Sequence, residues 1–297
     1  MLRRPAPPLA LAALAAVALA VTGVLAKLIP VTKQGDGHAL NGFVELNRPQ
    51  LTPLLDLVAH SANPGPYAVV AIVLALVALA RGRARVAIAI PVLFVLTGAT
   101  TEALKHVLAS PRYDEWLGPF AQVGAASWPS GHSTAAMTMA LCAVLAAPPR
   151  LRPTVAAIGS AYAVAVAYAI LTLGWHFPSD VFGGYLVASI YVLVAIAAIN
   201  ASEIRWPSRA GAEAATRPGD GIGAILVGLV AAAVVGGALL ARPHQLLGYA
   251  ASHTTFTLGA AAIAALAALI AGVMAIGFRG GGPGPPAARR PRQRVRV

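Results

Sequence analysis

Long, continuous apolar runs limit what this chain can fold into. Eight such runs lie at about residues 7–26, 66–80, 86–104, 132–147, 154–173, 181–199, 221–241 and 254–278. A helix needs about 20 apolar residues to span a bilayer, whereas the strands of a membrane barrel alternate apolar and polar residues. Because these runs are apolar throughout, they predict helices. The expected fold class is therefore all-α, a polytopic bundle of membrane helices in which the second and fourth spans are short.

The placement of charge supports this prediction. Only 11% of the 297 residues are charged, against about 25% in soluble domains, so a soluble domain is excluded. A net charge of +12 is compatible with nucleic-acid binding, but the 22 lysines and arginines are distributed unevenly along the chain. With a cytoplasmic N-terminus, sixteen of them fall on the inner side and six on the outer side, as the positive-inside rule requires.

This asymmetry predicts a multi-pass protein of the inner or plasma membrane with both termini in the cytoplasm. Its partners are then membrane lipids, whose anionic heads attract basic segments, and no nucleic acid. The first run follows the sequence MLRR, as in a signal peptide. It is long for such a peptide, and no convincing cleavage site follows, so we expect an uncleaved span.

Composition divides the chain into four parts. We expect a six-span core at residues 1–199, a charged cytoplasmic linker at 200–219, two further transmembrane helices at 220–278 and a disordered basic tail at 279–297. The seventh run carries small residues four apart, which let helices approach closely in lipid, either within the chain or in a homo-oligomer: Ala224, Gly228, Ala232 and Gly236. Residues 51–58 fit either an interfacial amphipathic helix or a packed loop.

Three polar clusters interrupt the apolar pattern. They read KHVLASPR at residues 105–112, WPSGHS at 128–133 and HFPSD at 176–180. Because each span reverses the direction of the chain, all three are expected at the outer side of the membrane. This convergence is stronger evidence for a functional site than any one cluster.

The first two clusters contain residues that suit a phosphate group. Lys105 and Arg112 have an ordinary explanation as cations at a helix end, yet a lysine point charge and a planar arginine together suit phosphate. Ser130 is a typical N-cap, and Gly131 allows close backbone approach where a helix N-terminus favours an anion. Capping and phosphate binding do not exclude each other.

The histidines of the second and third clusters favour catalysis. His176 precedes Asp180 by four residues, and an acid that accepts from one ring nitrogen leaves the other free as a nucleophile or base. His132 alone fits a buried, satisfied histidine, and Asp180 alone fits an acid in the first turn of a helix. Two histidines at the outer ends of neighbouring spans shift the interpretation towards proton transfer and nucleophilic chemistry.

These clusters resemble the three signature motifs of the phosphatidic acid phosphatase type 2 superfamily, over roughly residues 1–199. The resemblance implies a metal-independent phosphatase without cofactors that acts on lipid phosphates at the extracytoplasmic face. It implies that His176 forms a phosphohistidine, that Asp180 orients it, and that His132 protonates the leaving oxygen and later helps to activate water. The phosphate would be held by Lys105, Arg112, Ser130 and the amide of Gly131.

Two departures from the family pattern matter. Tyr113 replaces a proline after the first arginine, and Ala169 and Ile170 replace a Ser-Arg pair whose arginine contacts the phosphate in the family. Outer-side cations are candidates to replace that arginine: Lys33, Arg48 and Arg242. A phosphotransferase and a non-enzymatic binder or transporter of lipid phosphates therefore remain alternatives.

The motifs do not choose the substrate. Polyprenyl diphosphates, phosphorylated polyprenyl sugars, phosphatidylglycerol phosphate and phosphatidic acid all fit, and a carrier lipid of cell-envelope synthesis suits a site at the outer leaflet. Cys142 is the single cysteine, which excludes a multi-cysteine metal site.

Overall fold

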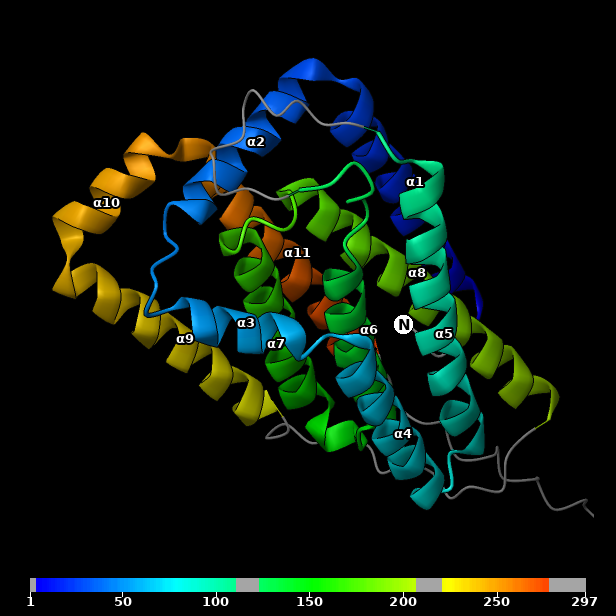
Figure 1. Ribbon diagram of the computed structural model, residues 1–297. Coiled ribbons are helices and arrows are strands. Elements are labelled where there is room, and N and C mark those ends of the chain that lie inside the picture. The colour runs from blue at the N-terminus through cyan, green and yellow to red at the C-terminus, as the bar shows by residue number, and fades with distance from the viewer. Residues whose placement is uncertain (1–3, 111–122, 207–220, 278–297) are drawn as a thin grey trace, which may run out of the picture.

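The computed structural model describes residues 4–110, 123–206 and 221–277, and every regular element in these ranges is helical (Figure 1). A helix covers each apolar run: α1 (Ala6–Leu28), α4 (Pro64–Ala80), α5 (Ala84–Val107), α6 (Gly131–Ala146), α7 (Arg152–Thr172), α8 (Pro178–Arg205), α9 (Ile222–Ala241) and α11 (Thr254–Gly277). Within these described ranges, five helices are long and apolar enough to cross a membrane, or seven when each of two bent pairs counts as one span. The predicted all-α membrane bundle is confirmed.

Shorter helices complete the described part of the chain: α2 (Pro30–Val44), α3 (Thr52–His60), the 3-10 turn η2 (Pro149–Leu151) and α10 (Pro243–Ser252). α2 was not predicted from the sequence. α3 covers the segment for which helix and loop were both open, and it meets α4 at 50°. Leu55 and Val58 of α3 pack against the core, whereas Leu54 and Leu57 are exposed.

α6 is the central helix of the bundle. All of its residues except Gly131, His132 and Ala143 are buried, and it packs against α4, α5, α7, α8 and α11. Its 16 residues extend about 24 Å, less than the roughly 30 Å of a bilayer core. The short fourth run thus belongs to a helix that protein, and not lipid, surrounds.

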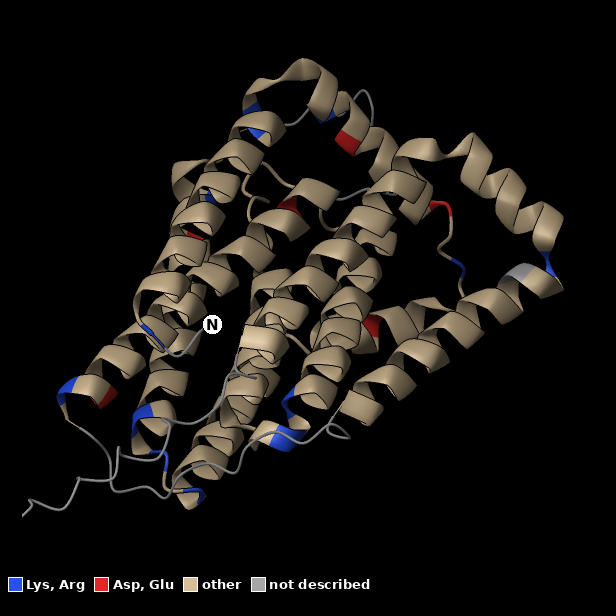
Figure 2. Cartoon of the chain, turned by 180° about the vertical axis from the view of Figure 1, so that it is seen from behind, with Lys and Arg blue, Asp and Glu red and all other residues tan. Residues whose placement is uncertain are grey.

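Arginines hold together the end of the bundle at which α4 joins α5 (Figure 2). The guanidinium groups of Arg81 and Arg83 donate to the carbonyls of Ala146 and Leu145 at the C-terminus of α6. A cation at a helix C-terminus also interacts favourably with the helix dipole. At the same end, Arg85 pairs with Glu203 near the C-terminus of α8 and donates to the carbonyl of Trp206.

The last two long helices differ in how they join the core. α11 packs against α2 and α7, where the Tyr168 hydroxyl donates to the Ala260 carbonyl at 2.7 Å and the Phe43 and Phe256 rings are 4.7 Å apart. α9 contacts α7 and then bends by 97° into α10.

Two of the small residues of α9 do not pack against other parts of the chain. A Cβ built on Gly228 or Gly236 would meet no atom within 4 Å. α8 continues to Arg205, which lies inside the segment 200–219 predicted as a linker. The rest of that segment after Trp206 and the predicted tail at 279–297 lie outside the described residues.

Candidate active site

The three polar clusters meet at the end of the bundle opposite to the arginines. A Cβ built on Gly131 would lie 3.3 Å from Nζ of Lys105, so the end of α5 touches the start of α6. The backbone N–H of Ser130 donates to the carbonyl of Asp180 at 2.9 Å, which joins the start of α6 to the start of α8. Arg112 and Tyr113 lie outside the described residues.

The His176–Asp180 pair is buried at the start of α8. Nδ1 of His176 lies 3.3 Å from Oδ2 of Asp180, and that oxygen also accepts the backbone N–H of Phe177 at 3.0 Å. The Asp180 side chain is fully buried, and 9% of His176 is exposed. Asp180 is therefore both a first-turn acid that satisfies a free N–H and the partner of His176. With Nδ1 donating to a carboxylate, neutral His176 carries its lone pair on Nε2.

The end of α7 directs His176 towards α6. Gly174 has a φ of +74°, a left-handed conformation that glycine adopts without steric cost at a helix C-terminus. The N–H groups of Gly174 and Trp175 donate to the carbonyls of Leu171 and Ile170, each at 2.9 Å. The chain then turns back, so that the Trp175 ring lies 5.6 Å from the ring of His132.

Two glycines let the second cluster lie directly on α8. A Cβ on Gly183 would come within 2.9 Å of the Trp128 indole nitrogen, and a Cβ on Gly184 within 2.7 Å of the Ser130 carbonyl oxygen. Any larger residue would push the two segments apart, as at other close helix contacts in membranes. The glycine pair that follows HFPSD in the sequence thus sets the distance between the two clusters.

His132 faces His176 across the site. The centroids of the two imidazole rings are 6.2 Å apart. Nε2 of His132 lies 2.9 Å from Oδ1 of Asn63, in the turn between α3 and α4. Asn63 had no predicted role, since it is 69 residues from His132. Its only signal is an asparagine before the Pro-Gly-Pro that starts α4.

The N-terminus of α6 forms a site suited to an anion. Ser130 is its N-cap, and the hydroxyl oxygen accepts the N–H of Ser133 at 3.2 Å. The N–H groups of Gly131 and His132, the first two helical residues, have no acceptor within a helix. With Nζ of Lys105 beside them, they create the positive environment that phosphate groups favour.

A carboxylate lies next to this anion site. Glu102 binds Lys105, with Oε1 2.7 Å from Nζ, and the same Oε1 would be 3.7 Å from a Cβ on Gly131. The Glu102 side chain is 58% exposed, so it is free to move. Sequence reasoning missed Glu102, although it lies one helical turn before Lys105 on the same face of α5.

A second missed acid anchors α8. Asp36 of α2 accepts the backbone N–H of Ser179 at 3.0 Å through Oδ1, and its Oδ2 accepts the Ser179 hydroxyl. The N-terminus of α8 is thus held by Asp36 from outside the helix and by Asp180 from within it. Asp36 and Ser179 are 143 positions apart in the sequence, which explains why the sequence did not reveal this contact.

A comparison with protein-family models relates part of the chain to a known family. The model described as the PAP2 superfamily matches residues 86–204. Residues 86–204 are thus similar to the PAP2 superfamily. The match runs from α5 into the last turn of α8 and contains all three polar clusters. Members of the superfamily are generally phosphatases, and the chain has a membrane phosphatase-like fold. The searches of curated proteins and of solved structures gave no match.

Within the matched segment, the position of the third-motif arginine of the family pattern is buried. Ile170 is fully buried in the apolar core. Among the cations that the sequence predicts on the outer side, Arg48 donates to the carbonyls of Glu45 and Asn47 at 2.7 and 2.9 Å. Arg242 lies at the α9–α10 junction, away from α6 and α8 in Figure 1, and Lys33 lies in α2. The two hydrogen bonds of Arg48 do not reach the clustered residues.

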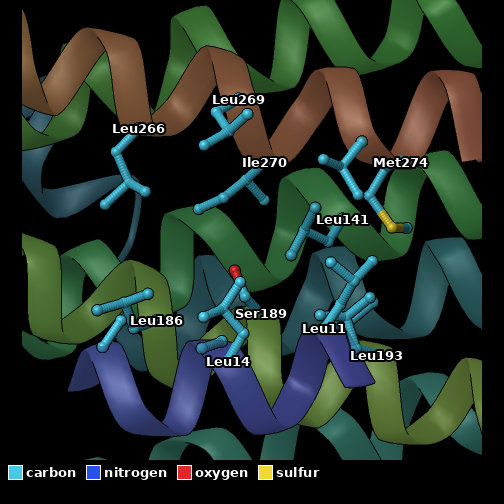
Figure 3. A pocket seen from close by; sticks show the side chains of 14 residues that line it. Leu11, Leu14, Leu141, Leu186, Ser189, Leu193, Leu266, Leu269, Ile270 and Met274 are labelled. Atoms are coloured by element: carbon cyan, nitrogen blue, oxygen red, sulfur yellow. The ribbon is translucent and has the colours of Figure 1, made fainter. Parts of the chain in front are cut away.

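Two further features concern what the site can hold. Across residues 4–110, 123–206 and 221–277, no group of three His, Cys, Asp or Glu side chains has an arrangement that could bind a metal ion. An apolar cavity of about 210 Å³ lies between α1, α6, α8 and α11 (Figure 3). Its α8 wall includes Ser189, nine residues or about two and a half turns after Asp180. The cavity is therefore on the other face of α8 and is separate from the clustered residues.

Proposed function

We propose that this protein is a membrane-embedded phosphatase that hydrolyses a lipid phosphate or a polyprenyl mono- or diphosphate through a phosphohistidine on His176. The observation that carries the proposal is the contact between His176 and the buried Asp180, which the Ser130–Asp180 hydrogen bond ties to the N-terminus of α6. A pure binding site does not need a histidine with an orienting acid.

In the first step, Nε2 of His176 attacks phosphorus. A nitrogen–phosphorus bond forms while the bond from phosphorus to the leaving oxygen breaks. His132 donates a proton to that oxygen, which leaves as an alcohol or, from a diphosphate, as a monophosphate. The Asp180 carboxylate stabilises the positive charge that develops on the His176 ring.

In the second step, water attacks the phosphohistidine. His132 takes a proton from the water as its oxygen bonds to phosphorus, and the nitrogen–phosphorus bond breaks to release phosphate and neutral His176. Lys105, the N–H of Gly131, Ser130 and Arg112 would hold the phosphate oxygens. The cycle consumes one water and needs no oxidant or reductant.

The site would face the outer leaflet of the inner or plasma membrane, in agreement with the excess of arginine at the other end of the bundle. This placement favours a polyprenyl carrier lipid of envelope synthesis as the substrate. An added Cβ would meet no atom within 4 Å at Gly228 or Gly236 of α9. We therefore propose that a homo-oligomer forms through this face of the helix.

A non-enzymatic binder of lipid phosphates is the second candidate, favoured by the buried Ile170 in place of an arginine. Loss of one charge-assisted hydrogen bond, about 1.5–3 kcal/mol, would slow the chemistry roughly ten- to a hundredfold, which is a smaller effect than loss of function. A phosphotransferase, in which an acceptor hydroxyl replaces water, is the third.

The test is phosphate release by the purified protein in detergent with EDTA present. The panel contains phosphatidic acid, phosphatidylglycerol phosphate and a polyprenyl diphosphate, with His176→Ala as the test variant and His244→Ala, on the exposed α10, as the matched control. We expect release by the wild type and His244→Ala only. No release from a folded wild type that still binds these lipids would favour the binder, and release only with an added acceptor alcohol would favour the transferase.

A further inference from the structure

Asn63 occupies a helix N-cap without capping the helix. It is the N-cap residue of α4, yet its side chain makes no capping hydrogen bond. An asparagine at this position ordinarily accepts the N–H of the second or third helical residue. Here the third residue is Pro66, which has no N–H. One of the two usual donors is missing, and the Asn63 amide turns instead to Nε2 of His132 at 2.9 Å.

This contact decides which nitrogen of His132 carries a proton. An amide oxygen only accepts hydrogen bonds, so Nε2 of His132 must be the donor to Oδ1 of Asn63. In neutral His132 the lone pair then lies on Nδ1, which is the atom free to gain or lose a proton.

The two histidines of the site therefore have partners of different kinds. His176 has a carboxylate, which supports the positive charge of a phosphohistidine. His132 has a neutral amide, which orients the ring and stabilises the imidazolium less strongly than a carboxylate does. A general acid must release its proton during the reaction, so a neutral partner suits His132 and a charged one suits His176.

We propose that Asn63 is a positioning residue that gives His132 the role of general acid, by keeping a proton on Nε2 so that the proton of the reaction leaves and returns at Nδ1. This inference rests on the proposed phosphatase function. The imidazolium gives its Nδ1 proton to the leaving oxygen, and neutral His132 takes a proton at Nδ1 from the attacking water. The Nε2 proton stays on the Asn63 hydrogen bond throughout, and the cycle restores the starting state.

Other groups also act on His132. Among the described residues, the ionisable side chains that act electrostatically on His132 are His176 from the loop before α8, Lys105 from α5 and His60 from α3. The Trp175 ring contacts both, with its centroid 5.7 Å from that of His60 and 5.6 Å from that of His132. All three ionisable groups stay unchanged in the variants below, so a change in pH dependence can be assigned to position 63.

The first measurement is independent of activity. Nitrogen-15 NMR of histidine-labelled protein in nanodiscs, with His132→Gln to assign the signal, reports the tautomer of neutral His132. We expect a protonated Nε2 in the wild type and a mixture of tautomers in Asn63→Ala. A protonated Nδ1 in the wild type would overturn the proposal even if the protein releases no phosphate at all.

The second measurement is the pH dependence of phosphate release. Asn63→Ala is expected to lower kcat by about ten- to a hundredfold, part of the usual contribution of a general acid, with KM little changed. Asn63→Asp places a carboxylate beside the imidazole and favours its protonated form. The alkaline limb of the kcat profile should therefore move to higher pH, by about one unit.

Ser61→Ala is the matched control in the same turn. The Ser61 hydroxyl bonds Tyr162 at 2.9 Å and the Val58 carbonyl at 2.6 Å, with no contact to His132. It is expected to lower thermal stability without moving the pH profile. If Asn63→Ala and Asn63→Asp behave like Ser61→Ala in both kcat and pH profile, Asn63 only supports the turn and the proposal is wrong. If the wild type releases no phosphate while NMR shows a protonated Nε2, the phosphatase function fails and the tautomer assignment stands.

Discussion

The two ends of the bundle use the same helices in opposite ways. At the arginine end, the C-terminus of α6 receives hydrogen bonds from Arg81 and Arg83, and Arg85 pairs with Glu203 of α8. At the other end, the N-termini of α6 and α8 meet, and N–H groups at the start of α6 lack an acceptor within their helix. At the arginine end, these three arginines bind groups of the protein itself. At the other end, the N–H groups at the start of α6 can bind a ligand. Polar groups at a membrane surface therefore indicate function where they converge on an open helix N-terminus.

Among variants that test this difference between the two ends, Asp180→Asn should cause the largest loss of kcat. The change keeps the shape of the side chain but removes the charge that supports His176, and a similar change in a histidine–acid pair lowers kcat about 10⁴-fold. We expect kcat to fall by roughly 10²- to 10⁴-fold in phosphate-release assays. Asp36→Asn, at the same helix end but bonded to Ser179, is the control. Equal losses in both variants would mean that Asp180 acts only by holding α8.

Lys105→Met should have the next largest effect. Removing the cation beside Gly131 takes away a charge-assisted hydrogen bond of about 1.5–3 kcal/mol, so kcat/KM should fall by roughly ten- to a hundredfold. The measurement is phosphate release over a range of lipid concentrations. The control is Arg242→Met at the α9–α10 junction, away from α6 and α8, which should keep wild-type kinetics. If it shows the same loss, general surface charge and not the α6 site attracts the substrate.

Glu102→Gln should act in the opposite direction. The Glu102 carboxylate binds Lys105 and lies beside the position where a phosphate would bind, so it competes with the substrate. Removing its charge should lower KM several-fold, because an exposed ion pair is worth about 0.2–1 kcal/mol. Titration of the purified variant with substrate checks this. An increase in KM would show that Glu102 holds Lys105 in its working position.

Arg83→Gln should change stability and leave the chemistry intact. Loss of a hydrogen bond to the α6 C-terminus is expected to cost on the order of 1 kcal/mol and to lower Tm by roughly 2–4 °C. The kcat per folded molecule should stay at the wild-type value. A loss of activity at unchanged Tm would mean that the arginine end also contributes to the chemistry, in contradiction to this prediction.

Sequence reasoning succeeded where one local property decides the structure. Apolar run length alone locates the eight long helices, and the reversal of successive spans places the three clusters together. It could not find α2, Asn63 or Asp36, because their roles come from contacts across 69 and 143 residues. Those contacts depend on the 50° bend between α3 and α4 and on the position of α2. Pro66 is the one local signal for the role of Asn63, because it removes an N–H that the Asn63 side chain would otherwise accept.

The proposed phosphohistidine on His176 is tested most directly by trapping the covalent intermediate. The purified protein is mixed with a lipid phosphate carrying a radioactive phosphoryl group and quenched in alkali, which preserves phosphohistidine. Peptide mapping then locates the label. We expect label on the peptide that contains His176 in the wild type and none in His176→Ala. Phosphate release without any labelled histidine, or label that persists in His176→Ala, would contradict it.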